Sequence, residues 1–215
     1  MIYPIIMAWL PSIYHLWVRK ISGLENIPRN EPFIIAPNHS SYYDTILPYT
    51  ILIPLLNKQI HALVNSMYWD YFFSRIIITH GQCIPVYVEK NTKSKKLNEI
   101  SLKKAANYIK KGDIIQMFPE GKRSYKGNLG KAYTGIAKLA LTTKSKVVPF
   151  GIIDSDKVFP KGKFLPRFKR CEIKIGRPMN LESYYGKPLT KNFLEQTTTK
   201  IMKEIAKLTG KKYTH

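Results

Sequence analysis

Short apolar runs alternate with longer amphipathic stretches along most of the chain. Each run is four to six residues long and is bounded by proline, glycine or polar residues, which is typical of strands buried in a sheet. Six segments have this pattern: residues 33–37, 61–64, 83–88, 114–118, 147–152 and 172–175.

Between these runs, apolar residues recur at helical spacing. In segment 93–111 they lie on one side of the expected helix, and Gly112 provides a stop signal. Segments 129–141 and 193–208 are also predicted to be helical. Helices that alternate with strands predict an α/β fold, with a mixed, mostly parallel sheet flanked by helices. The 215 residues include no low-complexity linker or internal repeat, so a single domain is expected.

The first eighteen residues depart from this alternation. They are nearly all apolar, include two tryptophans and two tyrosines, and are followed by an arginine and a lysine. The stretch is too short for a spanning helix of about 20 residues, and proline, serine and histidine interrupt it. It also lacks the basic start and the cleavage site of a signal peptide. Aromatic residues with a basic flank favour a position in the bilayer interface. We therefore predict a membrane-interface segment over residues 1–20 and an α/β domain over residues 21–215.

Two more stretches are rich in apolar or aromatic residues, namely 45–56 and 67–73. Both fit the core, which is the preferred interpretation for 45–56. Both also fit a second membrane surface.

Charge points to a polyanionic partner. Lysine and arginine number 35 against 14 acidic residues, so the formal net charge is +21. Such a charge attracts an anionic membrane leaflet, nucleic acid or an acidic carrier protein, unless the lysines only solvate helix faces. The apolar N-terminal segment favours the membrane, so nucleic acid is not expected as a partner.

The cysteines bear on compartment and metal binding. Cys83 and Cys171 are far apart in the sequence, and no cysteine or histidine pair has zinc-ligand spacing, so no metal is expected. Two unpaired cysteines without a secretory signal indicate a reducing environment. We predict association with the cytoplasmic face of a membrane.

The first candidate site lies at residues 38–44, which read Asn-His-Ser-Ser-Tyr-Tyr-Asp. On a straight helix His39 and Asp44 would lie about 140° apart. They can pair if the histidine lies in a loop after a strand and Asp44 lies in the first turn of a helix capped by Ser41. His39 would then be a general base for an acceptor hydroxyl, oriented by Asp44. The alternative is a simple capping box beside an ordinary loop histidine.

The second candidate site begins about eighty residues later, where residues 118–124 read Phe-Pro-Glu-Gly-Lys-Arg-Ser. The Pro-Glu-Gly turn ends a predicted strand, and ligands of open α/β sheets bind at such ends. Lys122, Arg123 and Ser124 can donate hydrogen bonds to a phosphate, and the arginine can do so with two nitrogens. The alternative is a solvated surface turn with scattered charges.

Together the two motifs resemble those of the glycerolipid acyltransferase family, which includes the 1-acyl-sn-glycerol-3-phosphate acyltransferases. The family's Asn-His-x-Ser-x-x-Asp is matched by Asn38, His39, Ser41 and Asp44. Its Phe-Pro-Glu-Gly-x-Arg-Ser is matched at 118–124, and the run 147–152 is similar to its valine-proline strand. The resemblance covers roughly residues 21–180 and implies a single acyltransferase domain.

A third family motif, Gly-x-Ile-Pro-Val-Asp-Arg, is matched only in part. Residues 81–86 read Gly-Gln-Cys-Ile-Pro-Val, but Tyr87 and Val88 follow in place of the acidic and basic residues. Glu89 and Lys90 can replace them if the loop is two residues longer, although a lysine lacks the planar fork of arginine. This departure keeps acceptors other than lysophosphatidic acid open.

The resemblance implies transfer of a fatty acyl group from acyl-CoA or acyl carrier protein to the free hydroxyl of 1-acylglycerol-3-phosphate, making phosphatidic acid in phospholipid biosynthesis. His39 and Asp44 would be catalytic, and no cofactor is implied beyond the acyl donor. Substrate binding is expected from Asn38, Lys90, Glu120, Gly121, Lys122, Arg123 and Ser124. The alternatives are an acyltransferase for another lysolipid, aminolipid or glycolipid, and a non-catalytic basic module that binds membranes or nucleic acid.

Overall fold

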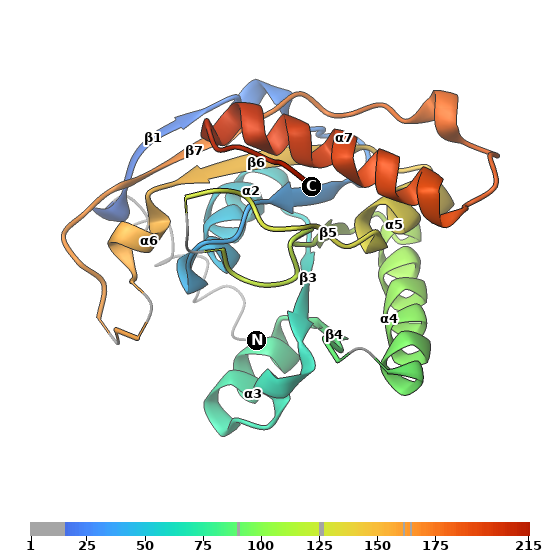
Figure 1. Cartoon of the computed structure of the whole chain (residues 1–215). Coiled ribbons are helices and arrows are strands. Elements are labelled where there is room, and N and C mark those ends of the chain that lie inside the picture. Colours follow the sequence, from blue (N-terminus) through green and yellow to red (C-terminus); the bar gives the residue numbers. More distant parts are fainter. Residues whose placement is uncertain (1–15, 90, 125–126, 161, 164) are drawn as a thin grey trace.

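The architecture is a mixed sheet covered by helices on both faces (Figure 1). The computed structural model describes residues 16–89, 91–124, 127–160, 162–163 and 165–215. Its seven-stranded sheet has the order β1-β7-β6-β2-β5-β3-β4. The strands are β1 (Val18–Ser22), β2 (Ile34–Pro37), β3 (Ile60–Asn65), β4 (Ile84–Val86), β5 (Ile114–Gln116), β6 (Val147–Ile153) and β7 (Cys171–Ile175).

The strand directions place several loops on one edge. β6, β2, β5, β3 and β4 are parallel neighbours in that order, whereas β7 runs antiparallel to β6 and parallel to β1. The carboxyl ends of the five parallel strands therefore share one edge of the sheet, which we call the carboxyl edge. The prediction of a mixed, mostly parallel sheet is confirmed.

Helices pack on the sheet because successive residues of a strand point to opposite faces. Ile34 and Val147 belong to one apolar cluster with residues of α4, α5 and α7, and the neighbouring Ile35 and Val148 belong to a second cluster with residues of α2. Burial on both faces explains the continuous apolar runs. The helices are η1 (Leu24–Asn26), η2 (Tyr42–Thr45), α2 (Leu47–Leu56), η3 (Ser66–Trp69), α3 (Phe72–His80), α4 (Thr92–Lys110), α5 (Gly135–Thr143), α6 (Ser155–Val158), η4 (Glu182–Tyr184) and α7 (Lys191–Thr209), where η marks a 3-10 helix.

The start of the predicted helix 129–141 is wrong, because α5 begins only at Gly135. The backbone nitrogen of Leu129 donates to the carbonyl of Lys212 over 3.0 Å, and that of Gly130 donates to Glu120 Oε2 over 2.6 Å. Tertiary partners therefore hold this backbone outside the helix.

The predicted boundary after residue 20 coincides with a strand. It lies inside β1, where Val18 is buried and the strand pairs with β7, so the domain includes residues from at least 18. Most of the predicted membrane-interface segment, residues 1–15, lies outside the described residues. None of the described helices combines the length and apolar character that crossing a bilayer requires.

The two ambiguous apolar stretches separate clearly. Segment 45–56 includes α2, whose Leu47 and Leu52 are fully buried, so its assignment to the core is confirmed. Segment 67–73 is instead largely at the surface, where the side chains of Phe72 and Phe73 are exposed.

Candidate active site

Asn38 fixes the loop that carries His39. β2 ends at Pro37, and the buried Asn38 side chain then donates from Nδ2 to the Ile152 carbonyl over 2.9 Å. In return, the Ile152 nitrogen donates to Asn38 Oδ1 over 2.7 Å. Because both ends of the amide are bound to β6, this structure assigns Asn38 to holding the loop, which differs from the predicted contact with substrate.

His39 and Asp44 form the predicted pair. His39 Nδ1 lies 3.1 Å from Asp44 Oδ2, and the aspartate is fully buried. The same oxygen accepts from the nitrogens of Ser40 and Ser41 over 2.6 and 2.7 Å. An acceptor-only carboxylate keeps the proton on Nδ1 and leaves Nε2 with a lone pair, which is the arrangement of a general base.

The capping box of the alternative interpretation is present as well. Ser41 caps η2 by accepting from the Tyr43 nitrogen over 3.2 Å, and Asp44 completes the capping box. One carboxylate therefore both starts the 3-10 helix and orients the histidine. The capping geometry supplies the chain reversal that a straight helix would not allow.

The second motif packs directly on the histidine. The ring of Phe118 stacks on that of His39 with the centroids 4.0 Å apart. The His39 nitrogen donates to Glu120 Oε1 over 2.9 Å, and the Ser124 nitrogen donates to the His39 carbonyl over 2.8 Å. The His39 side chain remains 15% exposed, so a substrate hydroxyl can reach it.

Glu120 supports this loop from inside. It is fully buried, and its Oε2 accepts from the Gly130 nitrogen over 2.6 Å and from the Ser124 hydroxyl. Together with the His39 backbone nitrogen, three donors converge on the Glu120 carboxylate. The negative charge of this carboxylate would repel a phosphate. The structure therefore gives Glu120 and the Ser124 side chain a part in loop support, and their role in substrate binding stays a prediction.

Gly121 and Lys122 occupy the turn itself. Gly121 has φ +63°, and a Cβ there would lie 2.9 Å from the ring of Tyr133, so only glycine fits. Lys122 is exposed next to it. Lys90, the other predicted phosphate ligand, lies outside the described residues.

Arg123 is held by residues that the sequence did not single out. Its Nη2 donates to the Tyr42 hydroxyl over 2.9 Å, and its Cζ lies 3.6 Å from the centroid of the Tyr42 ring. The Tyr68 hydroxyl donates to that of Tyr42 over 3.3 Å. Stacking on an aromatic ring orients a guanidinium group. The one feature of the sequence that points to a role for Tyr42 is its position inside the first motif.

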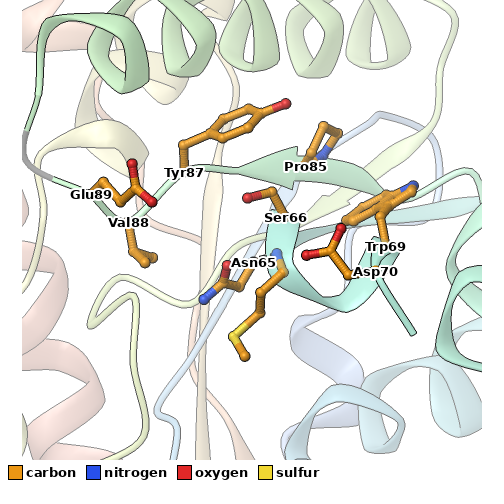
Figure 2. A pocket seen from close by; sticks show the side chains of 9 residues that line it. Asn65, Ser66, Trp69, Asp70, Pro85, Tyr87, Val88 and Glu89 are labelled. Atoms are coloured by element: carbon orange, nitrogen blue, oxygen red, sulfur yellow. Dashed lines mark hydrogen bonds between the residues drawn. The ribbon is translucent and has the colours of Figure 1, made fainter.

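A cavity of about 650 Å³ opens between the ends of β3 and β4 (Figure 2). Tyr87 and Val88, which replace the acidic and basic residues of the third motif, form part of its wall. Figure 2 shows Asp70 and Glu89 on opposite sides of it. Two carboxylates disfavour an anionic group there. The other lining residues are Asn65, Ser66, Met67, Trp69 and Pro85.

The described residues include no group of three histidine, cysteine or acidic side chains that could hold a metal ion. The site brings together the histidine, its carboxylate and the basic turn. A base beside an oriented guanidinium group suits transfer of a group to a hydroxyl.

Comparison with known proteins agrees with the geometry. A family model described as Acyltransferase matches residues 18–153, which include both motifs. The chain belongs to the acyltransferase family.

Several curated relatives carry a common name. This acyltransferase is 30% identical over 152 residues to the chloroplastic 1-acyl-sn-glycerol-3-phosphate acyltransferase of Arabidopsis thaliana, covering 70% of the chain and 40% of the relative. It is 27% identical to that of Borreliella burgdorferi, with 73% and 58% covered, and 26% identical to that of Bacillus subtilis, with 89% and 88% covered. The chain thus spans about two fifths to three fifths of the first two relatives.

The fold has a solved counterpart. The 1-acyl-sn-glycerophosphate acyltransferase from Thermotoga maritima superimposes with a TM-score of 0.68 at 20% identity, covering 99% of this chain and 81% of that one. This similarity supports the α/β architecture of the acyltransferase domain.

Proposed function

We propose that this acyltransferase moves a fatty acyl group from an acyl thioester to the free hydroxyl of 1-acylglycerol-3-phosphate, making phosphatidic acid. The observation that carries the proposal is the His39–Asp44 pair, packed against the loop that presents Arg123. The names of the curated relatives support the choice of acceptor. The thioester is acyl-CoA or acyl carrier protein.

The reaction needs one base and no covalent enzyme intermediate. His39 Nε2 takes the proton from the acceptor hydroxyl while its oxygen attacks the thioester carbonyl. The tetrahedral intermediate collapses, the carbon–sulfur bond breaks, and His39 returns the proton to the departing sulfur. Asp44 stabilises the imidazolium that exists between these steps. The products are the acylated acceptor and the free thiol.

Recognition of the acceptor phosphate falls to the basic turn. Arg123 can bind two phosphate oxygens at once, and Tyr42 holds its guanidinium group in place. Exposed Lys122 adds charge nearby, and Lys90 remains a predicted contributor. A fixed phosphate places the hydroxyl for attack, so positioning supplies part of the rate.

A second acceptor class is favoured by the cavity wall. Tyr87 and Val88 stand where the resemblance leads one to expect an acidic and a basic residue, and Asp70 and Glu89 make the cavity acidic. An acceptor with a cationic amine, such as another lysolipid or an aminolipid, fits this charge better than a second phosphate does.

We place the enzyme at the cytoplasmic face of a membrane. The acceptor of the proposed reaction is a lipid, and the net charge of +21 complements an anionic leaflet. The segment 1–20 remains the predicted anchor.

The test is acyl transfer from labelled acyl-CoA and acyl carrier protein to lysophosphatidic acid in anionic vesicles. We expect His39→Ala to lower kcat by about 10²–10⁴-fold, as loss of a general base does. Substitution of the exposed C-terminal histidine, His215→Ala, is the matched control and should retain activity. Arg123→Ala should raise KM for lysophosphatidic acid.

Other outcomes separate the alternatives. His39-dependent transfer to an amine-bearing lysolipid, but not to lysophosphatidic acid, favours the second acceptor class. Transfer to no acceptor, with polyanion binding indifferent to His39, would support a non-catalytic basic module.

A further inference from the structure

Two exposed apolar protrusions flank the active site on the carboxyl edge. α3 follows β3 through η3, and the segment 159–170 follows β6 through α6. In the sheet, β2 and β5, whose loops carry the active site, lie between β6 and β3. In Figure 1, α3 lies at the bottom of the view and α6, which leads into the segment 159–170, lies at the left.

Burial in the core does not explain why α3 is rich in apolar residues. Ile78 is the one residue of this helix that is buried. The Phe72, Phe73 and Ile77 side chains are 66%, 80% and 71% exposed, although all are strongly apolar. Contiguous apolar residues at a surface mark an interaction site. Arg75 adds an exposed positive charge to the same helix.

The segment 159–170 combines exposed apolar and basic side chains. Leu165 is 79% exposed and Phe168 is completely exposed. Between residues 157 and 170 the sequence has no acidic residue. The exposed cations described in this segment are Lys163, Arg167, Lys169 and Arg170.

The base of this segment is fixed to the domain. The Arg167 nitrogen donates to the Val158 carbonyl over 2.7 Å, and Trp17 Nε1 donates to the Arg167 carbonyl over 3.2 Å. The apolar side chains are therefore presented at a set position relative to the sheet.

We propose that α3 and the described residues of segment 159–170 together form a bilayer-contact face for an anionic lipid surface. Apolar side chains beside cations match the two layers of such a surface, the acyl region and the headgroup phosphates. With both protrusions inserted, the carboxyl edge faces the membrane, and His39 can receive an acceptor directly from the bilayer. This orientation rests on the proposed function, whereas the lipid binding does not.

The test is cosedimentation of the full chain with vesicles of phosphatidylcholine alone or with about 30% phosphatidylglycerol. The apolar variants are Phe72→Ser with Phe73→Ser, and Leu165→Ser with Phe168→Ser. Each pair should lower the partition coefficient by about tenfold or more, because two apolar side chains leave the interface. Arg167→Gln with Lys169→Gln and Arg170→Gln should lower it by about fivefold per charge, on anionic vesicles only.

Matched controls lie elsewhere on the surface. Ile100 on α4 is 62% exposed, so Ile100→Ser removes an exposed apolar side chain away from the proposed face, and we expect a change below about twofold. Removing three charges from α7, with Lys191→Gln, Lys200→Gln and Lys203→Gln, should weaken anionic binding clearly less than the triple change in segment 159–170. Circular dichroism checks that each variant is folded.

Several outcomes would overturn the proposal. Unchanged vesicle binding by both apolar pairs would assign lipid contact to another part of the chain. A dimeric mass in light scattering without vesicles, abolished by the Phe72 and Phe73 changes, would show that α3 binds a second copy. Equal losses in variants and controls would show that only overall charge and hydrophobicity matter.

Failure of this proposal can be told from failure of the proposed function. In the apolar variants, transfer to a short-chain, water-soluble acceptor should fall much less than transfer to the same acceptor class in vesicles. Wild-type binding through this face without any acyl transfer would refute the reaction alone. Acyl transfer that depends on His39, with binding insensitive to these substitutions, would refute the face alone.

Discussion

Asp44 accepts three hydrogen bonds through one oxygen, Oδ2, from His39 Nδ1 and from the nitrogens of Ser40 and Ser41. Its other oxygen, Oδ1, is buried without a hydrogen-bond partner among the described residues. All the hydrogen bonds of this carboxylate among the described residues therefore go to the histidine and to the start of η2. At the scale of the residue, the same hydrogen bonds to Asp44 Oδ2 both orient the base and cap the helix.

Asp44→Asn tests this double role. The amide is uncharged and cannot stabilise the imidazolium, so we expect kcat to fall by about 10²–10⁴-fold while KM changes little. Steady-state kinetics give the result, and Asp156→Asn on α6, an exposed aspartate, is the control. An unchanged kcat would mean that Asp44 is only a helix cap.

Cys171 gives a pH dependence of stability. Burial, with a smaller effect of the Asp44 charge, raises the pKa of this thiol to about 12 from its ordinary value of 9.0. Above pH 9 the unfolded chain releases the thiol proton and the folded protein does not, so stability falls as pH rises toward 12. Urea unfolding at pH 8 and 10.5 should show a drop about 2 kcal/mol larger in wild type than in Cys171→Ala. Equal drops in the two proteins would contradict this assignment.

At the scale of elements, the loops after β2 and β5 hold each other. The His39 backbone donates to Glu120 and accepts from Ser124, while Glu120 also binds Gly130 before α5. The catalytic loop is therefore fixed by the second motif rather than by its own strand alone. This explains why two segments about eighty residues apart form one site.

Glu120→Gln separates loop support from substrate contact. An amide presents its own donors to groups that also donate, so the free energy of unfolding should fall by about 1–3 kcal/mol. We expect kcat to fall more than KM rises, because the histidine loop loses its anchor. Denaturant unfolding and kinetics measure both, with exposed Glu195→Gln on α7 as the control. Unaltered stability with a selective rise in KM would restore the predicted role in substrate binding.

At the scale of the whole molecule, α7 closes one face of the sheet beside β6 (Figure 1). The approach is close at Gly151, where an added Cβ would lie 2.6 Å from the Cβ of Leu208 and 3.1 Å from its backbone carbon. The C-terminal helix and β6 are therefore packed without spare room. Just after Gly151, β6 ends and leads through α6 to the proposed bilayer-contact face, so the strand connects the α7 contact with that face.

Gly151→Ala should therefore destabilise the fold. The added methyl must push α7 away, and overpacking of this kind costs about 1–3 kcal/mol. Thermal and urea unfolding measure the loss. Gly135→Ala is the matched control, because the nearest contact of its added Cβ would be Met117 Sδ at 3.9 Å, and helix propensity makes that change neutral or stabilising. Equal effects of the two substitutions would refute the close packing.

Much of the site was predictable because it is local. His39 and Asp44 are five residues apart, and the capping signal at Ser41 is enough to anticipate their pairing. The contacts of Glu120 were not predictable, because a carboxylate in a turn looks the same in sequence whether it faces solvent or three buried donors. Tyr42 was missed for a related reason: its partner Arg123 is 81 residues away, and no periodicity connects them.

The sequence by itself determined the alternation of strands and helices, the capped turn that pairs histidine with aspartate, and the excess of positive charge. These depend on side-chain period and on contacts within a few residues. Only the tertiary structure decided which loops meet, that Asn38 and Glu120 are supports, and that the aromatic helix α3 is exposed. Those outcomes follow from strand order, which places β2 and β5 side by side between β6 and β3, and strand order is set by packing over the whole chain.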